Sequence, residues 1–302
     1  MARSPTTRRT RTLSAPGVGD GGDPADALPP GRDVELPGRG ATFVRELAGP
    51  PGAPTLMLLH GLTASADLNW GPSYAALARQ FRVVAPDLQG HGRGIPASLP
   101  FRLETCADDV AALADVLGIG RMVVVGYSMG GIVAQLVCRR HPRLVEGLVL
   151  CATASDFTIS GLEYVTVCSA FAAITFARLV PPVFHSGFDL VGRFVVGPLD
   201  DPVRHWVGSH LRQASVATTV SAAHAVSAFT SRRWVGDLDV PVAVVVTTRD
   251  RVVPPARQLD LARAIPGVET FVVDEGHGVC LGRPDLFIPA LLAACRSVAS
   301  RR

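Results

Sequence analysis

Lysine is absent from this chain of 302 residues, so every basic side chain is an arginine. Because alanine, glycine and proline are abundant as well, this bias favours an effect of genomic base composition over a functional requirement. The formal net charge is only +3, and the arginines are scattered except for Arg8, Arg9 and Arg11. Nucleic acids and anionic membranes are bound by concentrated basic patches, so we expect neither kind of partner.

Closely spaced cysteines and long apolar runs are also lacking. The six cysteines lie far apart in the chain, at Cys106, Cys138, Cys151, Cys168, Cys280 and Cys295. Without C-x-x-C pairs or histidines at ligand spacing, neither a zinc site nor a disulfide framework is indicated, and we expect no cofactor. No apolar run approaches the ~18 residues that span a bilayer, and the Arg8–Arg9 pair lacks the apolar segment of an export signal. We expect a cytoplasmic protein without a transmembrane segment.

The chain does contain a regular alternation of short apolar strands and amphipathic helices. Strands are predicted at residues 55–59, 83–85, 122–125, 148–150, 242–246 and 270–273, with an antiparallel edge hairpin near 41–47. Helices are predicted at residues 74–80, 103–117, 131–141, 255–265 and 285–298. This alternation predicts an α/β fold with a mostly parallel central sheet flanked by helices.

The apolar pattern also divides the chain into segments. Residues 1–33 have few apolar positions, so we expect a disordered N-terminal tail. Residues 34–153 and 237–302 are predicted to form the two parts of the core, and residues 154–236, which lack a convincing parallel strand, an inserted helical cap. The aromatic side chains of that insertion either belong to its own core or line an apolar pocket; they are Phe171, Phe176, Phe184, Phe188, Phe194 and Trp206.

The most informative stretch is R-M-V-V-V-G-Y-S-M-G-G at residues 121–131, where an apolar strand is expected to turn into a helix at Ser128. The surrounding glycines remove Cβ atoms that would clash in so sharp a turn, which leaves the hydroxyl projecting from the sheet edge. The pattern G-x-S-x-G is weak alone, and the alternative is a tight turn that merely contains a serine. The flanking strand and helix favour Ser128 as a catalytic nucleophile.

A serine hydroxyl needs a histidine base, and that histidine needs a carboxylate to orient it. His277 follows the last predicted strand in V-V-D-E-G-H-G-V and is the candidate base. Asp250 follows the preceding strand in V-V-V-T-T-R-D and is the candidate acid, with Asp156 as its rival. A surface position is the alternative for His277 and for Asp250.

Acyl transfer also needs two hydrogen-bond donors for the oxyanion. The backbone N–H of Met129 is one by its position after the serine. The second is expected from the loop that follows residues 55–59, and Leu62 N–H is our candidate. His60, at the start of that loop, is expected to brace it by hydrogen bonds rather than to act as a base.

At this point the chain resembles the α/β-hydrolase fold family, in its capped serine hydrolase branch of esterases and carbon-carbon hydrolases. The resemblance extends over residues 41–298 and rests on H-G at 60–61, D-L-Q-G-H-G at 87–92, the serine turn, and the order serine, aspartate, histidine. It implies a catalytic triad of Ser128, Asp250 and His277, an oxyanion hole of Leu62 and Met129, and a cap. One departure is Gly94, where family members often carry a serine.

We therefore expect a serine hydrolase that cleaves a carboxylic ester or related acyl substrate, mostly apolar, through an acyl-enzyme and without metal. Carbon-carbon bond cleavage and acyl transfer are alternatives on the same fold, and a non-catalytic small-molecule receptor is a third. A carboxylated substrate would need a cationic anchor, for which the cap offers Arg178, Arg193, Arg204 and Arg212. The sequence does not indicate an oligomeric state.

Overall fold

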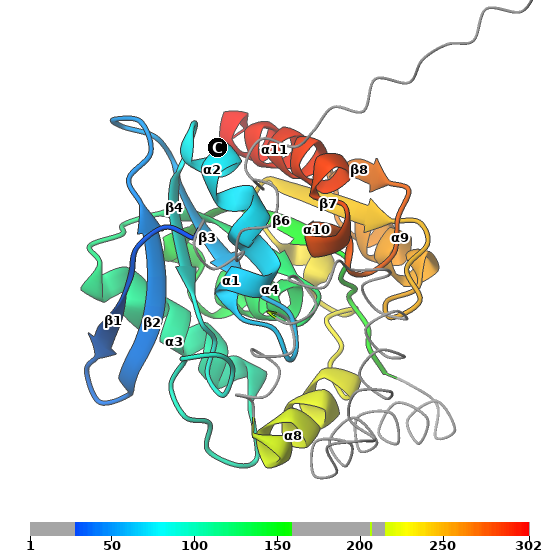
Figure 1. Cartoon of the computed structure of the whole chain (residues 1–302). Helices are drawn as coiled ribbons and strands as arrows, with labels where there is room; N and C mark the ends of the chain where they lie inside the picture. Colours follow the sequence, from blue (N-terminus) through cyan, green and yellow to red (C-terminus); the bar gives the residue numbers. More distant parts are fainter. Residues whose placement is uncertain (1–27, 159–205, 207–214, 302) are drawn as a thin grey trace, which may run out of the picture.

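A central twisted sheet with helices on both faces organises the chain (Figure 1). The computed structural model describes residues 28–158, 206 and 215–301. In that part of the chain the strands are β1 (Gly31–Leu36), β2 (Gly40–Leu47), β3 (Thr55–Leu59), β4 (Arg82–Pro86), β5 (Met122–Tyr127), β6 (Val145–Cys151), β7 (Val242–Thr247) and β8 (Glu269–Val273).

The strand order is β1-β2-β4-β3-β5-β6-β7-β8. β1 and β2 form an antiparallel hairpin that pairs antiparallel with β4, and the remaining neighbours are parallel. β5 and β7 are buried along their whole length, which explains their continuous valine-rich runs. The predicted α/β class with a mostly parallel sheet is confirmed.

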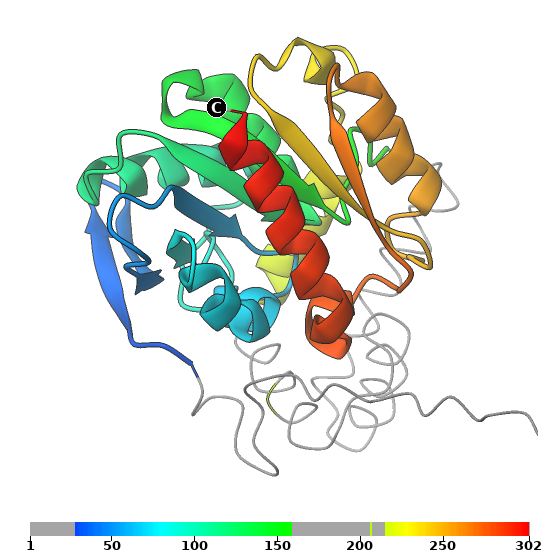
Figure 2. The ribbon, with the colours of Figure 1, turned by 90° about the horizontal axis from the view of Figure 1, so that it is seen from above.

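Helices cover both faces of the sheet (Figure 2). The helical elements are α1 (Ala66–Trp70), η2 (Gly71–Ser73), α2 (Tyr74–Ala78), α3 (Leu103–Val116), α4 (Met129–Arg140), η3 (Pro142–Leu144), α8 (Val216–Ser227), η4 (Val235–Asp237), α9 (Pro255–Ala264), α10 (Val279–Gly282) and α11 (Pro284–Ser300). Alternation along β3 separates two cores: Met57 and Leu59 pack with α3, α4 and α9, whereas Leu56 and Leu58 pack with α1, α2 and α11.

The structure corrects the expected start of the core. β1 begins at Gly31, so residues 31–33, which we placed in the N-terminal tail, are part of the edge hairpin. They pair with β2, so the antiparallel edge hairpin predicted near residues 41–47 is confirmed and begins at Gly31. The short helix α1 was not predicted, because a helix of five residues carries too little periodicity to detect.

Most of the expected cap lies outside the described residues. This applies to the four arginines and to five of the six aromatic side chains named above. Two described parts of the interval are Trp206, which is buried and packs against Leu68, and α8, which contacts α3. The helices of the described residues are all too short or too polar to cross a membrane.

Candidate active site

Ser128 lies at the turn from β5 into α4, in a backbone conformation of φ 54° and ψ −117°. A non-glycine residue adopts such angles rarely, and strained backbone of this kind is typical of functional sites. Three hydrogen bonds hold the turn. Ser128 N–H donates to Cys151 O at 2.9 Å, and its carbonyl accepts from Thr153 Oγ1 at 2.8 Å and from Gly131 N–H at 2.9 Å. The side chain is therefore presented by a rigid frame.

Two glycines beside the serine are required by close approach. A Cβ at Gly126 would overlap the backbone of Gly130, and one at Gly130 would overlap the carbonyl of Leu59 in β3. The turn is thus pressed against the neighbouring strand at a point where no side chain fits. The glycines predicted to open the turn also bring it against the loop after β3.

The structure brings Ser128, His277 and Asp250 together from three loops at the carboxyl ends of β5, β8 and β7. His277 Nε2 lies 3.1 Å from Ser128 Oγ, and His277 Nδ1 lies 2.7 Å from Asp250 Oδ2. The histidine side chain is 11% exposed, and the aspartate side chain is fully buried. A hydroxyl, an imidazole and a carboxylate in this order can pass a proton from the serine to the histidine.

Asp250 is held as a carboxylate by several donors. Its Oδ1 accepts from Val252 N–H and Val253 N–H, each at 2.8 Å, and its Oδ2 accepts from Thr247 Oγ1 at 2.8 Å. Burial acts to raise the pKa of Asp250, but the hydrogen bond and charge interaction with His277 and the other donors outweigh it and lower that pKa. Asp250 therefore stays ionised beside the imidazole.

Asp156, the rival acid, is engaged elsewhere. Its Oδ1 accepts from Thr158 N–H at 2.9 Å and Thr158 Oγ1 at 2.5 Å, and its Oδ2 lies 2.9 Å from Arg232 Nε. A bridge to Thr230 fixes its backbone. The geometry pairs His277 with Asp250 and leaves Asp156 to anchor the loop after β6.

The loop after β3 approaches the serine directly. A Cβ at Gly61 would stand 3.4 Å from Ser128 Cβ, and Gly61 N–H donates to Asn69 Oδ1 at 2.7 Å. Leu62 follows in a half-buried position, and Thr63 has a positive φ of 60°. Met129 is the buried first residue of α4. Both candidate oxyanion donors thus lie on backbone segments that flank Ser128.

His60 braces this loop, as expected. Its Nδ1–H donates to Gly61 O at 2.8 Å, and its Nε2 accepts from Leu88 N–H at 2.8 Å. The side chain is fully buried, and burial lowers the pKa of His60 to about 4. With both ring nitrogens engaged by backbone groups, His60 has no free nitrogen to serve as a base.

Four residues that the sequence analysis did not single out contact this site. Tyr127 Oη donates to the carbonyl of His277, and its ring packs edge-on against the imidazole at 5.6 Å. Asn69 joins Gly61 to Cys280, and Thr247 and Gln258 hold Asp250. Tyr127 lies beside the nucleophile and Thr247 ends a buried strand, so their positions offered a signal; Asn69 and Gln258 offered none.

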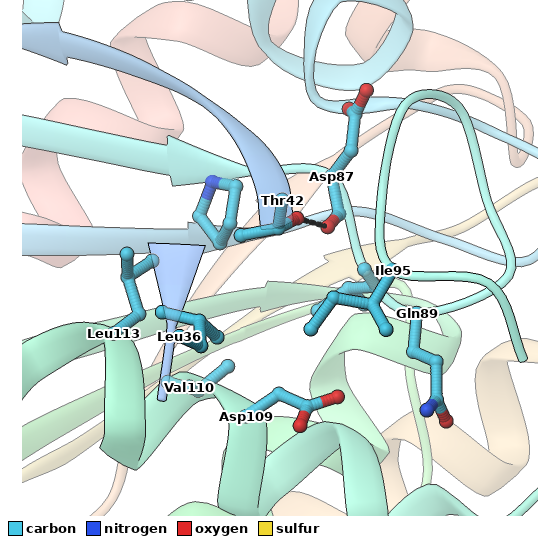
Figure 3. A pocket seen from close by; sticks show the side chains of 10 residues that line it. Leu36, Thr42, Asp87, Gln89, Ile95, Asp109, Val110 and Leu113 are labelled. Atoms are coloured by element: carbon cyan, nitrogen blue, oxygen red, sulfur yellow. Dashed lines mark hydrogen bonds between the residues drawn. The ribbon is translucent and has the colours of Figure 1, made fainter. Parts of the chain in front are cut away.

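A small pocket elsewhere contributes no chemistry of this kind (Figure 3). It lies between the β1–β2 hairpin, the loop after β4 and α3, and Leu36, Ile95 and Val110 line it. Asp87 and Asp109 are the charged side chains that line it, and Arg39 Nη1 lies 2.6 Å from Asp109 Oδ1. Among the described residues no group of three histidine, cysteine, aspartate or glutamate side chains could hold a metal ion.

Comparison with known proteins supports the family to which the sequence analysis pointed. The model of the alpha/beta hydrolase fold family matches residues 54–284. A non-heme chloroperoxidase of Streptomyces lividans is 31% identical over 267 residues, which are 82% of this chain and 94% of that protein. A poly(3-hydroxyalkanoate) depolymerase of Ectopseudomonas oleovorans is 26% identical over 86% of this chain and 90% of its own. The enol-lactonase of Burkholderia xenovorans LB400 superimposes with a TM-score of 0.74 at 25% identity, over 88% of this chain and all of that one.

Proposed function

Because the chain belongs to the α/β-hydrolase fold family, we propose that it is a serine hydrolase that cleaves a carboxylic ester or related acyl substrate through an acyl-enzyme. The observation that carries the proposal is the continuous contact from Ser128 Oγ to His277 Nε2 at 3.1 Å and from His277 Nδ1 to Asp250 Oδ2 at 2.7 Å. This arrangement supplies a nucleophile, a base and the group that orients the base.

The reaction proceeds in two halves. Ser128 Oγ attacks the acyl carbonyl carbon while His277 Nε2 takes the hydroxyl proton, and His277 then gives that proton to the departing alkoxide. Water, activated by the same nitrogen, cleaves the acyl-serine and restores the hydroxyl. Asp250 stays ionised, holds the Nδ1–H of His277 and stabilises the transient imidazolium.

The oxyanion of each tetrahedral intermediate is assigned to the backbone N–H groups of Leu62 and Met129. Support comes from the loop geometry, because Gly61 lies against Ser128 and its own N–H is already engaged by Asn69. Removal of a single such donor from a hydrolase costs about 3 to 4 kcal/mol of transition-state stabilisation. The braced, strained loop at His60 to Thr63 supplies the rigidity that this role needs.

A carboxylic ester is the substrate class that we favour. The fold neighbour is named as an enol-lactonase and one relative as a poly(3-hydroxyalkanoate) depolymerase, and lactones and poly(hydroxyalkanoates) both contain carboxylic ester bonds. The four arginines that could anchor a carboxylated substrate lie outside the described residues, and within those residues His277 is the basic side chain in contact with Ser128.

The test is hydrolysis of p-nitrophenyl esters from acetate to palmitate by the wild type and by Ser128→Ala, with a fluorophosphonate probe applied to both. We expect turnover and labelling of the wild type and loss of both in Ser128→Ala. Ser155→Ala is the matched control, since Ser155 is a buried serine at the same sheet edge and should keep both signals. Labelling without ester turnover would turn the search to carbon-carbon or acyl-transfer substrates, and the absence of labelling would contradict the proposal in favour of a receptor.

A further inference from the structure

The two oxygens of Asp250 are held in different ways. Oδ1 accepts from the backbone N–H groups of Val252 and Val253, each at 2.8 Å. Oδ2 accepts from His277 Nδ1 at 2.7 Å and from two side chains, Thr247 Oγ1 at 2.8 Å and Gln258 Nε2 at 3.2 Å. The main chain therefore fixes where the carboxylate lies, whereas side chains act on the oxygen that faces the histidine.

Gln258 can present only one orientation of its amide. Its Oε1 accepts from Thr247 N–H at 3.0 Å, and its Nε2 donates to Val253 O at 2.7 Å. A backbone N–H cannot accept and a carbonyl cannot donate, so these partners set the positions of oxygen and nitrogen without ambiguity. The Nε2 group is thereby directed at Thr247 Oγ1, 2.9 Å away, and at Asp250 Oδ2.

The hydroxyl of Thr247 has one hydrogen to give. It receives a hydrogen bond from Gln258 Nε2 and therefore directs its own hydrogen toward an acceptor, of which Asp250 Oδ2 at 2.8 Å is nearer than Gln258 Oε1 at 3.3 Å. Thr247 and Gln258 are both completely buried, so water does not compete for these bonds. Both side chains lie within one segment of the chain, at the end of β7 and in the first turn of α9.

We propose that Thr247 and Gln258 are positioning residues that limit how strongly Asp250 binds the protonated form of His277. This inference rests on the proposed function. Each hydrogen bond to Oδ2 withdraws electron density from the oxygen that accepts Nδ1–H. The carboxylate then orients the imidazole without stabilising the imidazolium so strongly that Nε2 keeps the proton it takes from Ser128. The base is kept ready to pass that proton to the leaving group.

In the part of the chain that the structure describes, few ionisable groups face the His277–Asp250 pair. Asp250 is approached by His277 from the loop after β8, by Tyr127 from β5, and by the neutral Thr247 and Gln258 from β7 and α9. Burial and the nearby Cys280 and Asp250 raise the pKa of Tyr127 far above its ordinary value, so the phenol stays neutral as the pair titrates. Tyr127 therefore adds no change of charge to the titration of the pair.

The experiment follows the Nδ1–H of His277 in the free protein by proton NMR between pH 4 and 8, with His277→Gln used to assign the resonance. Removal of the Thr247 hydroxyl in Thr247→Val leaves Oδ2 more basic while the backbone still holds Oδ1. We expect the pH at which the His277–Asp250 pair takes up a proton to rise by about half a unit or more. Thr247→Ser retains the hydroxyl and is expected to titrate like the wild type.

Gln258→Met provides a second, independent variant, because methionine has a similar length and donates no hydrogen bond. It should raise the pH at which the same resonance titrates. The acid limb of the pH profile of kcat/KM should move to higher pH in both variants. A purely structural role would lower the unfolding temperature without moving the titration. Thr247→Val and Gln258→Met that titrate like the wild type would overturn the inference. The resonance is measured without substrate, so this outcome is distinct from failure of the ester assay.

Discussion

Two histidines follow the carboxyl ends of strands in the same sheet but have different roles. His60, after β3, is fully buried, and both of its ring nitrogens are bound to backbone groups. His277, after β8, is 11% exposed in its side chain and binds a carboxylate on one nitrogen and a serine hydroxyl on the other. The two histidines differ in the partners of their ring nitrogens, which are backbone groups for His60 and side chains for His277, and in their exposure to solvent.

The surroundings of His60 extend this contrast. His91 is also buried and lies 5.5 Å from His60 between ring centroids, and burial together with repulsion from His60 lowers the pKa of His91 to about 4. This region keeps its imidazoles neutral and uses them as rigid hydrogen-bonding parts of the β3 and β4 loops. A histidine at a sheet edge is thus a base only where the fold leaves one nitrogen facing a reacting group.

The largest effect should come from replacing each of the two histidines by alanine. His277→Ala removes the base, and we expect kcat to fall about 10⁵-fold with little change in stability. His60→Ala leaves two backbone groups unpaired and a cavity behind, so the free energy of unfolding should fall by about 2 to 4 kcal/mol. Ester hydrolysis and urea unfolding of both variants measure this. If both variants lost similar activity per folded molecule, His60 would not have the purely structural role assigned to it.

A second pair compares the two aspartates at the carboxyl ends of β6 and β7. Asp250→Asn keeps the shape of the side chain but favours the wrong tautomer of His277, so kcat should fall about 10⁴-fold. Asp156→Asn weakens contacts with Thr158 and Arg232 but leaves the contacts of His277 with Ser128 and Asp250 intact, so kcat should stay within about threefold of the wild type. The reverse ranking would transfer the role of the acid to Asp156.

The third prediction concerns stability in acid. The pKa of His60 and of His91 is lowered from 6.5 to about 4 by folding, so between these values the unfolded chain binds more protons than the folded one. The stabilisation is complete above about pH 6.5 and is lost as the pH falls toward 4, by about 3 kcal/mol for each ring. Urea unfolding at pH 7.5, 6 and 5 should show this slope. His91→Phe should have a shallower slope, while the carboxylates common to both proteins cancel.

Much of the fold follows from patterns that are local in the chain. Apolar runs of three to five residues predicted β3 and β5 to β8. In β3 and β5 to β7 the runs reflect burial, because buried parallel strands need apolar side chains on both faces, whereas β8 is an edge strand and is mostly exposed. The β1 strand was missed because its residues Gly31 to Asp33 are exposed and carry no apolar signal. Its place depends on pairing with β2, a contact between segments that sequence periodicity does not encode.

The candidate site divides in the same way. Ser128 is marked by the glycines of its own turn, and His277 and Asp250 by the strands that precede them. Asn69 and Gln258 carry no such mark, since a polar residue on a helix is ordinary until the fold brings it against Gly61 or Asp250. Tertiary packing alone gives these amides their partners.

The amino-acid sequence determined the strand and helix pattern and the strained serine turn, because each depends on residues close together in the chain. It also marked Asp250 and His277 by the apolar strands that directly precede them. The tertiary structure decided which carboxylate meets His277, which histidine is buried, and which oxygen of Asp250 receives the side-chain donors. Those outcomes depend on hydrogen bonds between loops more than a hundred residues apart in some cases, as between Ser128 and His277, and such bonds form only once the sheet has aligned its strand ends.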